Sequence, residues 1–187
     1  MNGEWCYFKS YFSAEYCNQV INESKTLTFK RANLGENGLS SNNDYRKSEV
    51  TWLYPQNFPH LYDELWKLER EANKSWFGFH VDNLEYIQLA KYEGNIRAEY
   101  KKHQDVFWVN ENPRHRKLTA IVQLSSPDSY EGGNLTLFDC GEYPNKDEIK
   151  QQGTVIFFPS FIYHQANPVT SGTRYSLAAW FEGPKWR

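Results

Sequence analysis

The sequence predicts a single domain of the mainly β (α+β) class, with helices first and antiparallel strands after them. Five short runs rich in β-branched and aromatic residues follow residue 85, separated by turn signals. Two helical patterns precede them, and no linker or internal repeat divides the 187 residues. This order favours a two-sheet jelly roll or small barrel backed by N-terminal helices. We expect one domain over residues 1–187, with helical support over about 1–85 and a β core over about 86–187.

The two helices are predicted over residues 13–25 and 59–77. Ser13 is a candidate N-cap for the first, and Tyr16 and Val20 follow it at helical spacing. In the second, apolar residues recur at steps of three and four, with Pro59 at its start and Gly78 beyond its end. These apolar residues are Leu61, Leu65, Leu68, Ala72 and Trp76.

One strand is predicted ahead of the second helix and five after it. Each is a short run with high β propensity, bounded by turn residues such as Asn167-Pro168 and Ser171-Gly172. The predicted strands are residues 45–54, 86–92, 116–124, 133–138, 153–158 and 174–181.

The bulk composition excludes several classes of protein. Apolar residues make up 40% of the chain and aromatic residues 17%, which is typical of a globular domain. A net charge of -2 argues against a dedicated nucleic-acid binder. Three scattered cysteines, Cys6, Cys17 and Cys140, are too few for a disulfide framework and favour a reducing compartment. We read no signal peptide or membrane span, and we expect a cytoplasmic protein without a membrane partner.

The segment His103-Gln104-Asp105 is a candidate for two ligands of one metal ion. In an extended segment, residues i and i+2 point to the same side, so His103 and Asp105 share a face and Gln104 turns away. His164 follows the most apolar run of the chain and is the best third ligand. Two imidazoles and one carboxylate suit Fe(II) and leave coordination positions open.

Arg174 and Ser176 form a second candidate site. If residues 174–181 are a strand, these two share one face and Tyr175 and Leu177 take the other. A buried arginine needs an anion, and its guanidinium matches a carboxylate with two hydrogen bonds. A carboxylated small molecule bound between the metal and Arg174 would supply that anion.

These residues, in this order, resemble the signature of the Fe(II)/2-oxoglutarate-dependent dioxygenase superfamily. The surrounding sequence is similar to that of the prolyl-4-hydroxylase-like branch, over about residues 45–187 and most strongly from residue 86. The shared pieces are Tyr92-x-Gly94 and Tyr100 ahead of HQD, then RKLTAIVQLS, YEGGNLTLF, GTVIFFPSFIYH and GTRYSLAAWFEGP. Collagen-type hydroxylases carry a lysine at the position of Arg174, so the likeness is to the bacterial-like and oxygen-sensing-like members.

The resemblance implies a double-stranded β-helix that holds Fe(II) through His103, Asp105 and His164, the catalytic centre. It implies 2-oxoglutarate as cosubstrate, with ascorbate as a further candidate cofactor. Arg174 would hold the far carboxylate of 2-oxoglutarate with help from Ser176, and Tyr92 is similar to a tyrosine that binds the cosubstrate. Thr119 and Gln123 would line the same pocket if their strand face is the cavity face. Gln123 stands where some relatives carry a tyrosine, which leaves its role open.

The implied reaction is hydroxylation of an unactivated C–H bond with O2 and 2-oxoglutarate, giving succinate and CO2. A prolyl-hydroxylase-like reaction on a peptidyl or amino-acid substrate is the leading interpretation. The primary substrate itself, a peptide, protein or small molecule, stays open, and so does the choice between a monomer and a weak dimer. The polar segment 26–50 and the loops 93–100 and 106–115 are candidates to frame the entrance.

Several alternatives compete with this interpretation. A nucleic-acid or nucleotide dealkylase on the same core carries a second arginine six residues after the first, where this chain has Trp180. A jelly-roll binding module with an inactive site is the non-enzyme alternative, and intact ligands argue against it. His80 and Asp82 form a second His-x-Asp pair that could supply the metal ligands instead. We interpret the basic cluster Arg114, Arg116 and Lys117 as a solvated strand edge.

Overall fold

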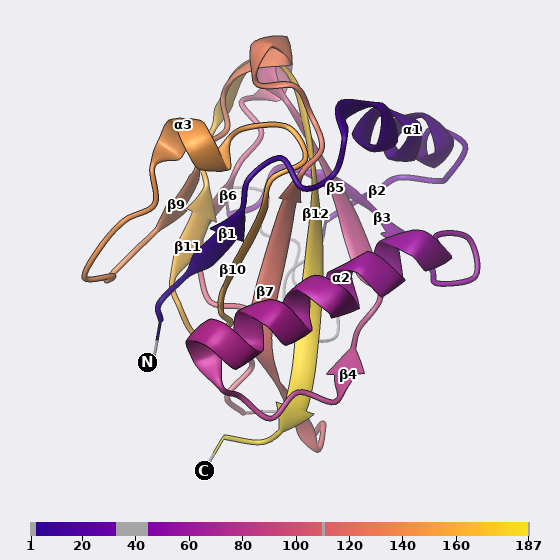
Figure 1. The fold of residues 1–187 in the computed structure, drawn as a ribbon. Helices are drawn as coiled ribbons and strands as arrows, with labels where there is room; N and C mark the ends of the chain where they lie inside the picture. The colour runs from indigo at the N-terminus through magenta and orange to yellow at the C-terminus, as the bar shows by residue number, and fades with distance from the viewer. Residues whose placement is uncertain (1–2, 33–44, 110, 187) are drawn as a thin grey trace.

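The computed structural model describes residues 3–32, 45–109 and 111–186, and two antiparallel sheets form its framework (Figure 1). In spatial order, the larger sheet contains β1 (Cys6–Phe8), β10 (Val155–Pro159), β7 (Arg114–Gln123), β12 (Val169–Pro184), β5 (Ile87–Glu93), β3 (Glu49–Leu53) and β2 (Lys30–Arg31). Two short strands, β4 (Asn83–Leu84) and β8 (Tyr130–Gly132), also pair with β12. The smaller sheet contains β6 (Tyr100–His103), β11 (His164–Ala166) and β9 (Leu135–Leu137).

The two predicted helices are confirmed. Helix α1 (Ala14–Ser24) begins after Ser13, whose Oγ accepts a hydrogen bond from the Tyr16 amide. Helix α2 (Pro59–Ala72) continues as a π-helical turn to Phe77 and ends at Gly78. Gly78 has a φ of 70°, the left-handed conformation that glycine adopts at little cost. A short helix, α3 (Lys146–Ile149), was not predicted. None of the helices in the described ranges combines the length and apolar character that a membrane crossing requires.

Helix α2 covers one face of the larger sheet, as Figure 1 shows. Its buried residues Leu61, Leu65 and Leu68 belong to the same core cluster as Leu89 of β5 and Leu118 of β7. Each such leucine stabilises the fold by roughly 1.5–3 kcal/mol when it leaves water. The helix therefore closes one side of the sheet, and the side chains on the other side face the smaller sheet.

Strand β12 shows this division residue by residue. Tyr175 packs against the core cluster under α2 and Leu177 belongs to it, whereas Arg174 and Ser176 line a cavity on the opposite face. The predicted alternation is confirmed. The strand itself is longer than predicted, because the expected turn at Ser171-Gly172 lies inside it. The pairing of β12 with β8 shifts register just before this pair, between Val169 and Ser171, and is regular at Ser171 and Gly172, so the strand continues through them.

The other predicted strands are confirmed as β3, β5, β7, β9 and β10, with shifts at their ends. The N-terminal part is more than helical support, since β1, β2 and β3 belong to the larger sheet. Part of the polar segment expected at the entrance, residues 33–44, lies outside the described residues.

Candidate metal and cosubstrate site

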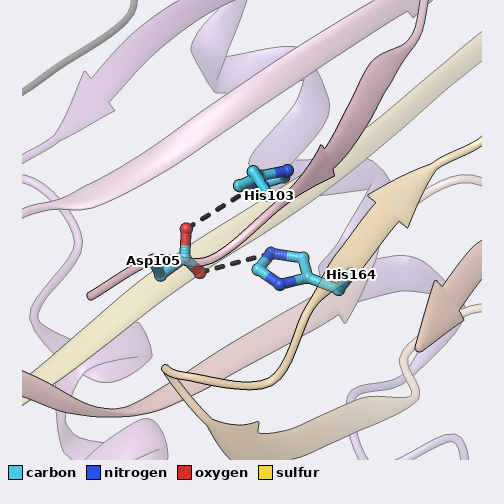
Figure 2. A group of neighbouring side chains, drawn as sticks. All are labelled: His103, Asp105 and His164. Atoms are coloured by element: carbon cyan, nitrogen blue, oxygen red, sulfur yellow. Dashed lines mark ion pairs between the residues drawn. The ribbon is translucent and has the colours of Figure 1, made fainter. Parts of the chain in front are cut away.

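His103, Asp105 and His164 come together at the neighbouring ends of β6 and β11. The strand pairing places His164 directly opposite His103, and their ring centroids lie 4.1 Å apart. Asp105 follows His103 by two residues and turns its carboxylate toward both rings (Figure 2). All three side chains are buried. The pairing of β6 with β11 thus brings His164 next to His103, although the two residues lie 61 positions apart in the sequence.

The side chains of these three residues converge at short range. Nε2 of His103 lies 3.6 Å from Oδ1 of Asp105, and Nε2 of His164 lies 3.3 Å from Oδ2. Their potential ligand atoms all lie within 4.8 Å of one another. Within residues 3–32, 45–109 and 111–186, no other cluster of three or more His, Cys, Asp or Glu side chains meets this distance.

The backbone fixes which nitrogen of each imidazole carries its proton. Nδ1 of His103 lies 2.7 Å from the Lys101 carbonyl oxygen, and Nδ1 of His164 lies 3.0 Å from that of Ile162. A carbonyl oxygen only accepts, so each Nδ1 is the donor and each Nε2 presents a lone pair. Two nitrogen lone pairs therefore face a carboxylate, and this set of acceptors fits a bound cation such as Fe(II).

Burial sets the charge of these groups. Desolvation, followed by the neighbouring His164, lowers the pKa of His103 to about 3, so its imidazole is neutral at neutral pH. Burial alone would raise the pKa of Asp105, but in the acidic range where Asp105 titrates, the positive charge of protonated His164 and then of protonated His103 outweighs burial and holds that pKa well below its usual range. A neutral imidazole and an ionised carboxylate are the forms that bind a metal ion.

Asp105 is oriented by groups around it. The Thr119 hydroxyl donates to Oδ2 at 2.8 Å, and the Asp105 amide donates to the Ser160 carbonyl oxygen at 2.9 Å. Gln104 turns away and donates to the Phe161 carbonyl oxygen, as its position between the two ligands predicts. Thr119 was expected to line the cosubstrate pocket. It instead contacts Asp105 and is absent from the residues that line the cavity.

Arg174 lies in the same cavity as the three candidate ligands. Its side chain is fully buried, its Nη2 donates to Oε1 of Gln123 at 2.9 Å, and its Cζ lies 5.3 Å from the ring centroid of Tyr92. Its Nε has no hydrogen-bond partner among the described residues, and no acidic residue among them forms an ion pair with it. A guanidinium with an unsatisfied N–H in a closed cavity fits a carboxylate ligand.

The remaining predicted cosubstrate residues divide into two groups. Tyr92 and Ser176 line the cavity beside Arg174, and Tyr92 is also the strand partner of Arg174. Gln123 is the strand partner of Ser176 and contacts Arg174 from behind the cavity. Gln123 therefore orients the arginine and does not itself line the cavity.

The second His-x-Asp pair is not a metal site, so this alternative was wrong. Nε2 of His80 lies 4.0 Å from Oδ2 of Asp82, both are well exposed, and no third donor joins them within the described residues. Asp82 instead pairs with Arg114. An exposed carboxylate with its own arginine partner is a surface ion pair.

Lys117 of the basic cluster is buried and Arg116 is partly covered, which corrects the prediction of a solvated edge. Arg116 forms a two-point pair with Glu85, with Nε–Oε1 at 2.8 Å and Nη2–Oε2 at 2.6 Å. Its Cζ lies 3.9 Å over the ring of Trp180. Lys117 lies over Trp186. These long side chains are covered by aromatic rings, a feature that strand periodicity does not reveal.

A groove of about 560 Å³ leads from Asp105 to the surface. Trp180 and Phe107 line it together with Arg116, and Trp52 lies farther out. Burial, followed by the hydrogen bond that protonated Glu182 donates to the Glu85 carboxylate, raises the pKa of Glu182 in this groove to about 7. The groove also contains Arg46, a buried residue that no sequence pattern indicates.

Comparison with known proteins is consistent with this geometry. Residues 87–182 match the family described as the 2OG-Fe(II) oxygenase superfamily, and this range includes all three candidate ligands and Arg174. A PKHD-type hydroxylase of Shewanella sp. (strain ANA-3) is 31% identical over 106 residues, or 57% of this chain and 37% of the relative. The chain thus matches little more than a third of that relative's length.

Solved structures share the fold over nearly the whole chain. One is a viral collagen prolyl hydroxylase of Paramecium bursaria Chlorella virus-1 in a 2OG complex, with a TM-score of 0.70, 22% identity and 96% of each chain covered. Another is a prolyl hydroxylase of Trichoplax adhaerens bound to a peptide fragment of the hypoxia inducible factor oxygen degradation domain. Its TM-score is 0.75 at 20% identity, with 96% of this chain and 83% of that chain covered. The expected double-stranded β-helix with N-terminal helices on its major sheet is confirmed.

Proposed function

Because the chain belongs to the 2OG-Fe(II) oxygenase superfamily, we propose that His103, Asp105 and His164 bind its Fe(II) and that Arg174 anchors 2-oxoglutarate. The observation that carries this proposal is one cavity that contains both the converging donors and a buried arginine that forms no ion pair with any acidic residue the structure describes. When bound, the iron, 2-oxoglutarate and O2 supply the oxidation of an unactivated C–H bond, with succinate and CO2 as co-products.

The residues of the chain prepare this site for its ligands. The Lys101 and Ile162 carbonyl oxygens hold the protons on Nδ1 of the two histidines and keep each Nε2 free for the metal. Thr119 holds the Asp105 carboxylate in place. Gln123 orients Arg174, while Tyr92 and Ser176 complete the wall that receives 2-oxoglutarate.

We propose a prolyl-hydroxylase-like reaction on a peptidyl or amino-acid substrate. The prolyl hydroxylase names of the structural relatives support this assignment, as does the groove that leads from Asp105 past Trp180. The dealkylase alternative has less support, because Trp180 replaces the second arginine of that branch. We further propose that residues 1–187 act as one domain in a reducing compartment such as the cytoplasm. This proposal is supported by three free, buried cysteines and by the N-terminal strands of the larger sheet.

An anaerobic titration with Fe(II) and 2-oxoglutarate tests the proposed site. Binding of both to the wild type gives the metal-to-cosubstrate charge-transfer band. We expect His103→Ala to abolish the band and Arg174→Ala to raise the 2-oxoglutarate concentration needed for it by at least tenfold, since it removes a charged hydrogen-bond donor.

His80→Ala and Arg97→Ala are the matched controls, because they remove the same side chains outside the cavity. Both are expected to leave the band and its half-saturation unchanged. An unchanged band in His103→Ala, or its loss in His80→Ala, would refute the assignment of the metal ligands.

A further inference from the structure

Arg46 is a second buried arginine beside the candidate metal ligands, and its partners carry no charge. Its Nε donates to Oγ of Ser48 at 2.9 Å and its Nη2 donates to Oε1 of Gln88 at 2.7 Å. Its Cζ lies 4.3 Å from the ring centroid of Tyr100. Among the residues that the structure describes, no carboxylate forms an ion pair with it, and its Nη1 makes no hydrogen bond to them.

The backbone fixes Arg46 in this place. Arg46 forms an isolated antiparallel bridge with Tyr100, the first residue of β6. Hydrogen bonds on both sides secure the bridge, from the Lys47 amide to the Glu99 carbonyl oxygen and from the Lys101 amide to the Tyr45 carbonyl oxygen. Arg46 is therefore part of the ordered framework that carries His103, three residues beyond Tyr100.

Charge balance distinguishes Arg46 from Arg116, which also lines the groove. Arg116 has the two-point carboxylate partner Glu85, whereas Arg46 has two neutral oxygen acceptors and one aromatic ring. Removing a guanidinium from water without an anion is costly, and a ligand anion offsets that cost. Arg174 likewise has no carboxylate partner among the described residues. In the proposed function, the far carboxylate of 2-oxoglutarate is that partner.

The position of Arg46 indicates which ligand it would meet. Arg46 lines both the inner cavity with the three candidate ligands and the outer groove that reaches the surface. It is linked to the metal site through Tyr100, whose ring stacks on that of His103 with centroids 3.5 Å apart. Lys30 and Arg31 of β2 also line the groove, and neither forms an ion pair with a described residue. This end of the groove is thus positively charged and adjoins the site of oxidation.

We propose that Arg46 is the anchor for a carboxylate of the primary substrate. The inference rests on the proposed function and narrows its substrate class to a molecule with a carboxylate near the C–H bond that is oxidised. Nη1 and the free N–H of Nη2 form the edge that a carboxylate engages with two hydrogen bonds. Arg46 then orients the substrate, and Arg174 stays reserved for the cosubstrate.

The test compares acids with their amides on the anaerobic complex with Fe(II) and 2-oxoglutarate. The probes are N-acetyl-L-proline, N-acetyl-L-leucine and N-acetyl-L-aspartate α-methylamide, each with the matching carboxamide, and binding is measured by calorimetry. With 2-oxoglutarate already bound, we expect at least one acid to bind the wild type tenfold or more tightly than its amide. Arg46→Gln should remove this preference, and Arg46→Lys should retain part of it.

The 2-oxoglutarate titration distinguishes whether Arg46 binds a carboxylate of the primary substrate or a carboxylate of 2-oxoglutarate. Arg46→Gln should keep the charge-transfer band and change the half-saturation for 2-oxoglutarate by less than twofold, which also shows that the variant is folded. Arg70→Gln, on the exposed side of α2, is the control and should match the wild type in every measurement.

Three outcomes overturn the inference. In the first, no acid binds the wild type better than its amide. In the second, Arg46→Gln keeps the preference for acids. In the third, Arg46→Gln raises the half-saturation for 2-oxoglutarate tenfold, which would assign Arg46 to the cosubstrate. Absence of the band in the wild type would instead refute the proposed function, and the inference with it.

Discussion

The Thr119 hydroxyl donates a hydrogen bond of 2.8 Å to Oδ2 of Asp105, the oxygen that lies 3.3 Å from Nε2 of His164. Thr119 is fully buried on β7, and its Oγ1 also lies 3.0 Å from Oγ of Ser160. A neutral donor fixes the direction of the carboxylate without neutralising it. Asp105 thus keeps the charge that a metal ion requires and loses the freedom to rotate.

Replacing Thr119 by valine should therefore weaken metal binding. Valine keeps the shape of threonine and removes the hydroxyl, and loss of such an orienting partner costs roughly 10–100-fold in metal affinity. We expect Thr119→Val to raise the dissociation constant for Fe(II) about tenfold in an anaerobic titration. Thr170→Val, at an exposed position of β12, should bind Fe(II) like the wild type. Equal affinities in all three proteins would show that Asp105 needs no help from Thr119.

Gln123 offers a way to test the role of Arg174 by adding a charge. Its Oε1 accepts a hydrogen bond from Nη2 of Arg174, and the site is closed to solvent. Glutamate has the same shape, so Gln123→Glu should pair with Arg174 and compete with the cosubstrate carboxylate. We expect the half-saturation for 2-oxoglutarate to rise at least tenfold in the anaerobic charge-transfer titration.

Gln123→Leu separates the effect of charge from the loss of the amide. It removes the acceptor without adding an anion, and we expect a rise of only a few-fold. Gln56→Glu adds the same charge at an exposed position and should have no effect. If glutamate at position 123 leaves 2-oxoglutarate binding unchanged, Arg174 is not its anchor.

Gly133 packs directly against the stem of Arg174. A Cβ added there would lie 2.9 Å from Cδ of Arg174, and its φ of 63° disfavours any side chain. Gly78 has a similar φ of 70°, but a Cβ there would meet nothing within 4 Å. Both alanine variants should lose about 1–2 kcal/mol of unfolding free energy through backbone strain. Only Gly133→Ala should also weaken 2-oxoglutarate binding, because it displaces Arg174. Equal binding in both variants would contradict this role.

The parts of the site that the sequence predicts are those fixed by local geometry. His103 and Asp105 share a face because they are two residues apart on an extended segment, and Arg174 and Ser176 do so for the same reason. Among the three metal ligands, only His164 had to come from a distant segment. Its position after the apolar run 155–158 was enough to predict it as a ligand, because the chain leaves β10 and reaches the edge of the cavity at His164, where β11 begins.

The residues that escaped prediction depend on pairings between distant segments. Arg46 reaches Gln88 across 42 residues, and the contact of Thr119 with Asp105 depends on how β7 lies behind the loop that follows β6. Neither contact has a periodic pattern. The full length of β12 escaped prediction for a related reason, since Ser171-Gly172 is a turn signal by composition, whereas in the structure both residues pair with β8 inside the strand.

Glu69 links the stability of the fold to pH independently of the metal site. It is 3% exposed on α2, and its Oε1 has no hydrogen-bond partner among the described residues. Burial raises its pKa to about 7, which Asn73 and Arg70 oppose only weakly. Its unfolded-state pKa is near 4.3. Below that value both states hold the proton and Glu69 costs nothing. Between pH 4.3 and 7 the unfolded state gives up this proton and the folded state keeps it, so the free energy of unfolding falls progressively, by up to about 4 kcal/mol, and changes no further above pH 7.

Glutamine has the shape of the protonated acid and never ionises. Glu69→Gln should therefore raise the unfolding free energy by about 1–3 kcal/mol at pH 8 and leave it unchanged at pH 4.5, as measured by urea denaturation at both pH values. Glu71→Gln, exposed on the same helix, should change stability little at either pH. A gain for Glu69→Gln that is equal at both pH values, or larger at pH 4.5, would show that the buried carboxyl does not titrate between them.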